Sequence, residues 1–213
     1  MFALYVHWLK SEPLLAAAIQ FAILGTLGDR IAARLRGGNW QTDKMEVLCK
    51  LPTWAILGIS VKLAFLGGSG ATKSLIEHGY FPTFGLFVFF FAFYKSFLVN
   101  AFFGPFMMIG HRLSDDYLAR CRFSPASILR GLPKARLWAG LEAINWKSLK
   151  SSISLLTIFW VPAHTLTFLL PEHFQITMAA LWAIVLGLML GYFNREEKKQ
   201  PAGQRLEEKA TQS

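Results

Sequence analysis

Charged residues are scarce in this chain of 213 residues, where they make up 16%, against roughly 25% in ordinary soluble domains. A soluble protein of this size must cover its surface with charge, whereas a chain surrounded by lipid has no such need. Apolar residues make up 54% of the chain, and phenylalanine alone occurs 19 times. The composition therefore excludes an ordinary soluble domain and predicts an integral membrane protein.

The residues that usually carry enzyme chemistry are also few and scattered. The two cysteines, Cys49 and Cys121, are far apart and form neither a disulfide framework nor a metal-binding signature. The five histidines do not cluster in the sequence, and no serine lies in a nucleophile elbow. We therefore expect a protein that is not an enzyme and has neither a metal site nor a cofactor.

One glycine-rich segment has the outline of a phosphate-binding loop. It runs from Gly67 to Ser74, but Thr72 stands where that motif needs glycine, and no buried strand precedes it. We interpret it as a flexible turn between two membrane spans.

Five apolar stretches organise the chain, and a span needs about 20 mostly apolar residues. They are residues 13–28, 51–68, 81–109, 153–170 and 176–193. The first, second and fourth are short and contain polar atoms, which neighbouring helices must satisfy. We predict an all-α polytopic bundle of four to five spans. Residues 1–193 form its single transmembrane domain, and residues 194–213 form a charged soluble tail.

The basic residues separate the connections into two kinds. The connections after the first and third stretches and the C-terminal tail are rich in Lys and Arg, whereas the other connections and the N-terminus carry one basic residue or none. This alternation follows the positive-inside rule and places the tail and both long connections on the positive side, with the N-terminus opposite. It also explains the net charge of +9 without a nucleic-acid partner.

The connection before the fourth stretch contains a further helical pattern. From Pro133 to Ser151, Leu137, Leu141 and Ile144 recur at helical spacing among basic residues. The pattern is typical of an amphipathic interfacial helix on anionic lipid such as cardiolipin. A helix docked against the ends of the bundle is the alternative.

Ionisable residues within or at the ends of the apolar stretches are candidates for function. Asp29 closes the first stretch, Lys62 lies in the second and Lys95 in the third. Because an unpaired charge in hydrocarbon costs several kcal/mol, these residues should pair or face water. They form either an Asp29–lysine pair that fixes the bundle or a polar lining to a pathway.

Uncharged polar residues add two stripes to this set. Ser96 and Asn100 are four residues apart and share one helix face. A second stripe lies within the fourth stretch, where polar side chains recur at spacings of three and four residues. It consists of Thr157, Trp160, His164 and Thr167. Such stripes either pack helix on helix or line a narrow aqueous path, and the sequence leaves both open. The candidate polar network is Asp29, Lys62, Lys95, Asn100 and His164.

Proline and glycine mark the expected geometry of the helices. Pro105 and Pro162 fall inside apolar stretches and predict kinks. Gly187 and Gly191 form a small-xxx-small pattern, which predicts close approach of another helix, within the chain or in a homo-oligomer.

Three blocks of residues resemble a known family. The first is Tyr5, Leu9 and Pro13 followed by Gly28-Asp29, and the second is Lys95 with Pro105 ten residues later. The third comprises Trp160, Pro162, His164, Phe168 and Pro171. Together they resemble, in divergent form, the Mpv-seventeen / twenty-two-kilodalton peroxisomal membrane protein family, with spacing that suits the chain as far as Phe193.

The resemblance implies a small multi-helix protein of an organelle membrane. It implies the mitochondrial inner membrane, or alternatively the peroxisomal membrane, and a pore or small-solute channel. The alternative function is a structural accessory subunit within a larger mitochondrial, respiratory-type membrane complex. The expected partners are membrane lipids, with a homo-oligomer or a larger membrane complex as further possibilities, and no nucleic acid.

Overall fold

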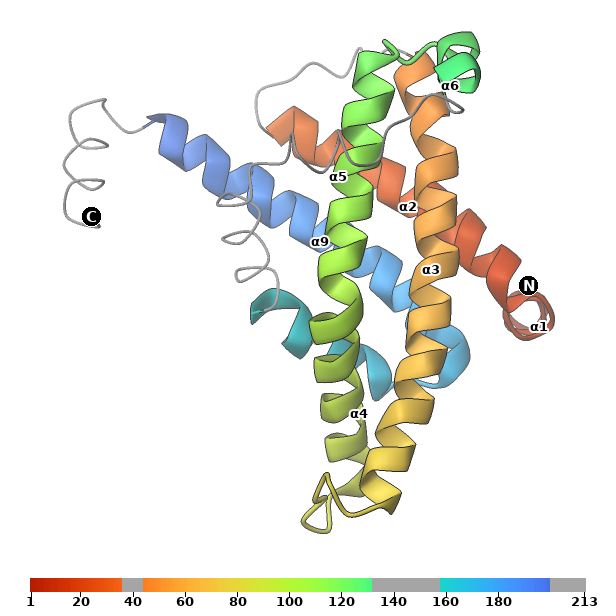
Figure 1. Ribbon diagram of the computed structural model, residues 1–213, viewed down its shortest axis with the longest axis vertical. Helices are drawn as coiled ribbons and strands as arrows, with labels where there is room; N and C mark the ends of the chain where they lie inside the picture. Colours follow the sequence, from red (N-terminus) through yellow and green to blue (C-terminus); the bar gives the residue numbers. More distant parts are fainter. Residues whose placement is uncertain (36–43, 132–157, 200–213) are drawn as a thin grey trace.

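The computed structural model describes residues 1–35, 44–131 and 158–199, with side chains described as far as Met189. This part of the chain is all helical (Figure 1). Its labelled elements are α1 (Phe2–Ser11), α2 (Pro13–Leu35), α3 (Lys44–Glu77), α4 (Phe87–Leu98), the π-helix η1 (Val99–Phe103), α5 (Gly104–Arg120), α6 (Pro125–Gly131) and α9 (Glu172–Lys199). A further helix covers residues 158–168.

Four helices in the described residues are long and apolar enough to cross a membrane. They are Pro13–Leu35, Lys44–Glu77, Phe87–Arg120 and Glu172–Met189. The predicted all-α bundle of four to five spans is therefore confirmed as an architecture. The fourth predicted stretch, 153–170, is described only from residue 158 onward, and its residues 158–168 are helical.

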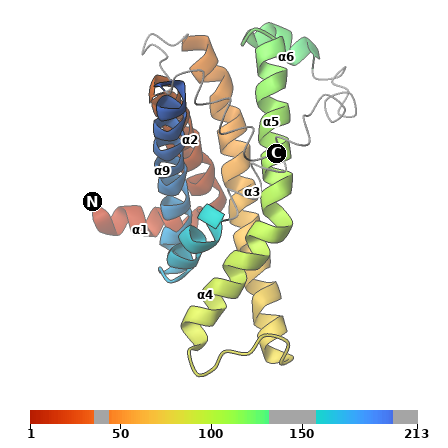
Figure 2. The ribbon, with the colours of Figure 1, turned by 90° about the vertical axis from the view of Figure 1, so that its left-hand side faces the viewer.

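Contacts between distant residues fix the direction of each helix. The helix α3 runs antiparallel to its neighbours, through the contacts Ala17–Gly58 and Asp29–Lys50 with α2, and Thr53–Ser114 and Gly68–Val99 with α5 and η1. The helix α9 runs parallel to α2. Tyr5 in α1, the helix that precedes α2, forms a hydrogen bond with Thr177 near the start of α9, and Gly28 near the end of α2 lies against Gly187 further along α9. Hence α2, α5 and α9 all end at the same end of the bundle (Figures 1 and 2).

This polarity places the end of α5 and the start of α9 at opposite ends of the bundle. The described helix at 158–168 lies between Arg120 and Glu172 in the sequence. The basic residues of the connections gather at the shared end, in agreement with the charge alternation. They are Arg30, Arg34, Lys44, Lys50, Arg112, Arg120, Arg122 and Arg130.

Small residues let α2, α3 and α9 approach closely. A Cβ atom added at Gly58 would overlap the carbonyl oxygen of Ala17, and one added at Gly187 would lie 3.0 Å from the carbonyl oxygen of Gly28. Ala17 itself is fully buried. Close backbone approach of this kind is how helices associate where lipid removes the hydrophobic driving force.

The kink predicted at Pro105 takes the form of a π-helical turn. Proline has no N–H and its ring crowds the carbonyl four residues earlier, so the regular hydrogen-bond ladder cannot continue there. The N–H of Gly104 instead donates to the carbonyl of Val99, five residues back. Figure 2 shows α4 inclined to α5 on either side of this turn.

The segment Gly67–Ser74 is helical, so the expected flexible turn is wrong. It belongs to α3, which continues to Glu77, and the turn lies at Gly79 and beyond. Packing outweighs the helix-breaking tendency of glycine here, since Thr72 is fully buried and Gly68 fits against the side chain of Val99. The predicted amphipathic helix at 133–151, Thr157 and the tail beyond Lys199 lie outside the described residues.

Candidate functional site

A cavity of about 420 Å³ lies between α2, α3, α5, α9 and the helix at 158–168. Its middle is lined by apolar and aromatic side chains, among them Phe21, Leu57, Val61, Phe103, Met107 and Leu186. Polar side chains stand at its two ends. We call these the Asp29 end, with Asp29, His111, Arg112 and Asp115, and the His164 end, with Asn100 and His164.

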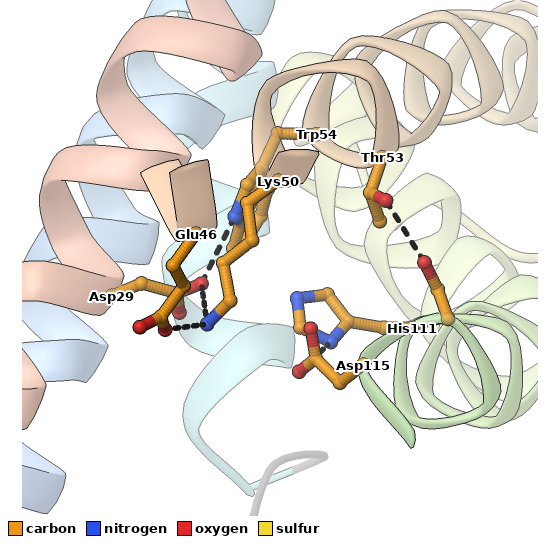
Figure 3. A network of polar contacts seen from close by, with 8 residues as sticks. Asp29, Glu46, Lys50, Thr53, Trp54, His111 and Asp115 are labelled. Carbon is orange, nitrogen blue, oxygen red and sulfur yellow. Dashed lines mark hydrogen bonds and ion pairs between the residues drawn. The ribbon is translucent and has the colours of Figure 1, made fainter. Parts of the chain in front are cut away.

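The Asp29 end is built around an ion pair between α2 and α3 (Figure 3). The Lys50 ammonium lies 3.6 Å from Asp29 Oδ2 and 3.4 Å from a carboxylate oxygen of Glu46. The indole Nε1 of Trp54 donates to Asp29 Oδ2 at 3.1 Å. One carboxylate is thus shared by a cation and a neutral donor one helical turn apart on α3.

The helix α5 contributes a second pair at the same end (Figure 3). The imidazole Nδ1 of His111 lies 3.2 Å from Asp115 Oδ2, one turn further along α5. The His111 ring also packs edge-on against Trp54, with 4.8 Å between ring centroids. Trp54 therefore touches both pairs and joins the charged groups of α2 and α3 to those of α5.

The His164 end is a buried hydrogen-bonded cluster. Asn100 Nδ2 donates to the carbonyl of Ser96 at 2.8 Å and contacts His164 Nδ1 at 3.1 Å. The hydroxyl of Ser96 donates to the carbonyl of Val161 at 2.7 Å. The ring of Trp160 stacks on the imidazole at 4.8 Å. These bonds tie α4 and η1 to the helix at 158–168.

Lys95 lies next to this cluster, outside the lining of the cavity, with 2% of its surface exposed. Its ammonium donates to the side-chain oxygen of Gln175 at 2.9 Å. It also stands 4.0 Å from the ring centroid of Phe168 and 5.6 Å from that of Phe65. An amide and two aromatic faces, without an ion-paired carboxylate among the described residues, make up its surroundings.

The structure brings together only part of the predicted polar network. Lys95, Asn100 and His164 gather in one region, and Lys62 stands apart in an ion pair of 2.9 Å with Glu172 at the start of α9. Asp29 lies at the opposite end of the cavity. Asp29 pairs with Lys50 and not with Lys62 or Lys95, the lysines predicted for this pair, because Lys62 is about three helical turns further along α3.

The other predicted positions mainly shape the helices. Pro13 begins α2, and Pro171 precedes α9. Gly28 and Gly187 pack against one another within the chain, and Trp160 covers His164. Pro162 lies in the helix at 158–168, and the backbone of Gly191 lies in α9.

Sequence reasoning missed Trp54, His111, Asp115 and Gln175. The spacing of His111 and Asp115, four residues apart on a helix, was a usable signal. It was obscured because the basic connection after the third stretch seemed to begin there, whereas α5 continues to Arg120. Within the described residues, no group of three or more His, Cys, Asp or Glu side chains could hold a metal ion.

No family model, curated protein or solved structure matches this chain. The resemblance to the Mpv-seventeen family therefore stays a prediction that depends on the residues quoted for it.

Proposed function

We propose that this chain is a multi-pass protein of an organelle membrane whose helices form a pathway for a small solute. The observation that carries the proposal is the cavity with polar groups at both ends, lined mainly by helices that have the length and composition of membrane spans. Pockets of a few hundred Å³ with apolar walls and a few convergent polar groups are typical of small-molecule sites.

The extent of the cavity supports passage as well as binding. It reaches from Val99 in η1 to Asp115 in α5, a length of about 24 Å at 1.5 Å per residue. That length approaches the roughly 30 Å of a bilayer's hydrocarbon core. Polar residues inside membrane spans commonly mark the path of a solute or ion.

The proposed location is the mitochondrial inner membrane, with the peroxisomal membrane as the alternative. The resemblance to the Mpv-seventeen family supports this location. The basic end of the bundle would face the matrix or the cytosol, since Lys and Arg are retained on that side of a membrane. The ends of α2, α5 and α9 all lie there.

Reconstitution of the purified protein in a planar bilayer tests the proposal. We expect discrete conductance steps above the lipid background in the presence of a small-solute electrolyte. Folded, monodisperse protein that gives no conductance, and no solute release from loaded liposomes, would rule the pathway out. A heat-unfolded sample reconstituted in the same way controls for leaks caused by aggregates.

A second candidate, a structural accessory subunit in a larger membrane complex, is favoured by the outer face of α4. Phe89, Phe93 and Phe97 recur every four residues, and each is more than one third exposed. Exposed apolar rows of this kind mark contact with a protein partner or with lipid. Native gels in mild detergent from the source membrane would distinguish the two, because migration as a small free oligomer contradicts the subunit hypothesis.

A further inference from the structure

The charges near the His164 end do not balance. Lys62 and Glu172 form an ion pair of 2.9 Å, whereas the near partners of the Lys95 ammonium are the neutral amide of Gln175 and the rings of Phe168 and Phe65, with Glu172 acting on it from beyond ion-pair distance. The described titratable groups of this region therefore sum to one positive charge, carried by Lys95. Because the charge of Glu172 is already paired with Lys62, the buried ammonium of Lys95 is incompletely compensated, which favours a further negative charge nearby.

The imidazole of His164 is oriented to donate a hydrogen bond. Asn100 Nδ2 can only donate, so His164 Nδ1, 3.1 Å away, accepts and the proton of the neutral ring lies on Nε2. Trp160 fixes the plane of the ring by stacking on it, and His164 forms part of the cavity wall. The Nε2–H group is thus a hydrogen-bond donor whose orientation is fixed by Asn100 and Trp160.

Lys95 and His164 act on the same small region. Both lie against the ring of Phe168, the ammonium at 4.0 Å and the imidazole at 5.8 Å from its centroid. In a buried, weakly polarisable setting, the field of an ammonium at such separations is much stronger than in water. An acceptor that meets the imidazole donor would therefore also gain from the positive potential of Lys95.

At the opposite end of the cavity the cations Lys50 and His111 already have acidic neighbours. Asp29 and Asp115 line that end together with Arg112 and His111, Lys50 lies 3.6 Å from Asp29, and His111 lies 3.2 Å from Asp115. Between the ends the wall is apolar, with Phe21, Val61, Phe103, Met107 and Leu186 among its members. An anion with an apolar body would therefore place its charged group at the His164 end.

The geometry points to a binding site for a small organic carboxylate in this cavity. The carboxylate accepts from His164 Nε2–H in the field of Lys95, and the apolar body lies between Phe21, Leu57 and Met107. The inference adds a solute class to the proposed pathway and rests on the same cavity. It is measured as binding in detergent, so a protein that binds but does not conduct would fail the pathway proposal alone.

Three probes of nearly equal size and different charge test the inference on the unaltered protein. They are benzoate, benzamide and benzylammonium, titrated into purified full-length protein in detergent by isothermal calorimetry at neutral pH. We expect benzoate to bind at least tenfold more tightly than benzamide, and benzylammonium to bind more weakly than either. Equal affinities for the three probes, or preference for benzylammonium, would overturn the inference.

Variants then locate the charge that matters. Lys95→Gln should abolish the preference for benzoate over benzamide while leaving benzamide binding unchanged, whereas Lys95→Arg should retain most of it. Lys73→Gln is the matched control, since Lys73 lies exposed on α3 away from the cavity. A preference that persists in folded Lys95→Gln protein would contradict the role of Lys95.

His164→Phe separates the donor from the charge. It removes Nε2–H and keeps a flat ring beneath Trp160, so benzoate affinity should fall about tenfold and benzamide affinity should fall less. If a Lys95 or His164 variant fails to fold, the three-probe comparison on unaltered protein still decides the question.

Discussion

Gly58 of α3 lies directly against the carbonyl oxygen of Ala17 in α2, with no room for a side chain between the two backbones. The same part of α3 also packs on Phe21 of α2. The contact therefore sets how closely α2 and α3 can approach one another. Gly67, on the same helix, has no atom within 4 Å of the place its Cβ would take.

Gly58→Ala should therefore separate α2 from α3. We expect it to lower the free energy of unfolding by about 1–3 kcal/mol or more, the usual cost of overpacking a tight contact. Gly67→Ala should leave stability unchanged or raise it by up to about 1 kcal/mol through better helix propensity. Thermal unfolding in detergent, followed by circular dichroism, measures both, and equal effects would show that the close contact does not form.

The bond from Trp54 to Asp29 should contribute measurably to the bundle. A hydrogen bond to a charged acceptor is worth about 1.5–3 kcal/mol. Trp54→Phe removes the donor and Asp29→Asn removes the charge, so a double-mutant cycle on unfolding free energy should give a coupling of about 1–2 kcal/mol. Additive effects of the two substitutions would mean that the bond contributes nothing.

Water should reach the side of α5 that faces the cavity but not the outer face of that helix. Met107 lines the cavity, whereas the preceding residue, Phe106, is 74% exposed on the outside. In a background with Cys49 and Cys121 replaced by serine, Met107→Cys should react with a charged methanethiosulfonate in liposomes at least tenfold faster than Phe106→Cys. The reverse order would place the cavity in lipid or seal it from water.

The two ends of α3 should lie on opposite sides of a membrane. His78 is exposed in the connection after α3, and Cys121 lies at the end of α5, at the other end of the bundle. In sealed, oriented vesicles, His78→Cys in a cysteine-free background and Cys121 alone should be labelled from opposite sides by an impermeant maleimide. Labelling of both from one side would contradict the antiparallel arrangement of spans.

Much of the helical architecture was predictable because apolar runs and basic connections are local properties of the chain. The runs around Phe21, Phe65 and Trp182 indicated spans, and the spacing of Ser96 and Asn100 placed both on one buried face. The limits of α3 and α5 were less predictable. The glycines at 67, 68 and 70 suggested a turn, but burial of Thr72 and the contact of Gly68 with Val99 extend the helix.

The sequence by itself determined that this is an all-helical chain with the composition of a membrane protein and one basic end. These properties follow from hydropathy and from helical periodicity, which need no knowledge of neighbours. Only the tertiary structure decided that Asp29 pairs with Lys50, that Lys62 pairs with Glu172, and that Lys95 has no carboxylate partner among the described residues. Such pairings depend on the register and direction of helices that are up to 110 residues apart in the chain, and a linear pattern of residues does not encode that register.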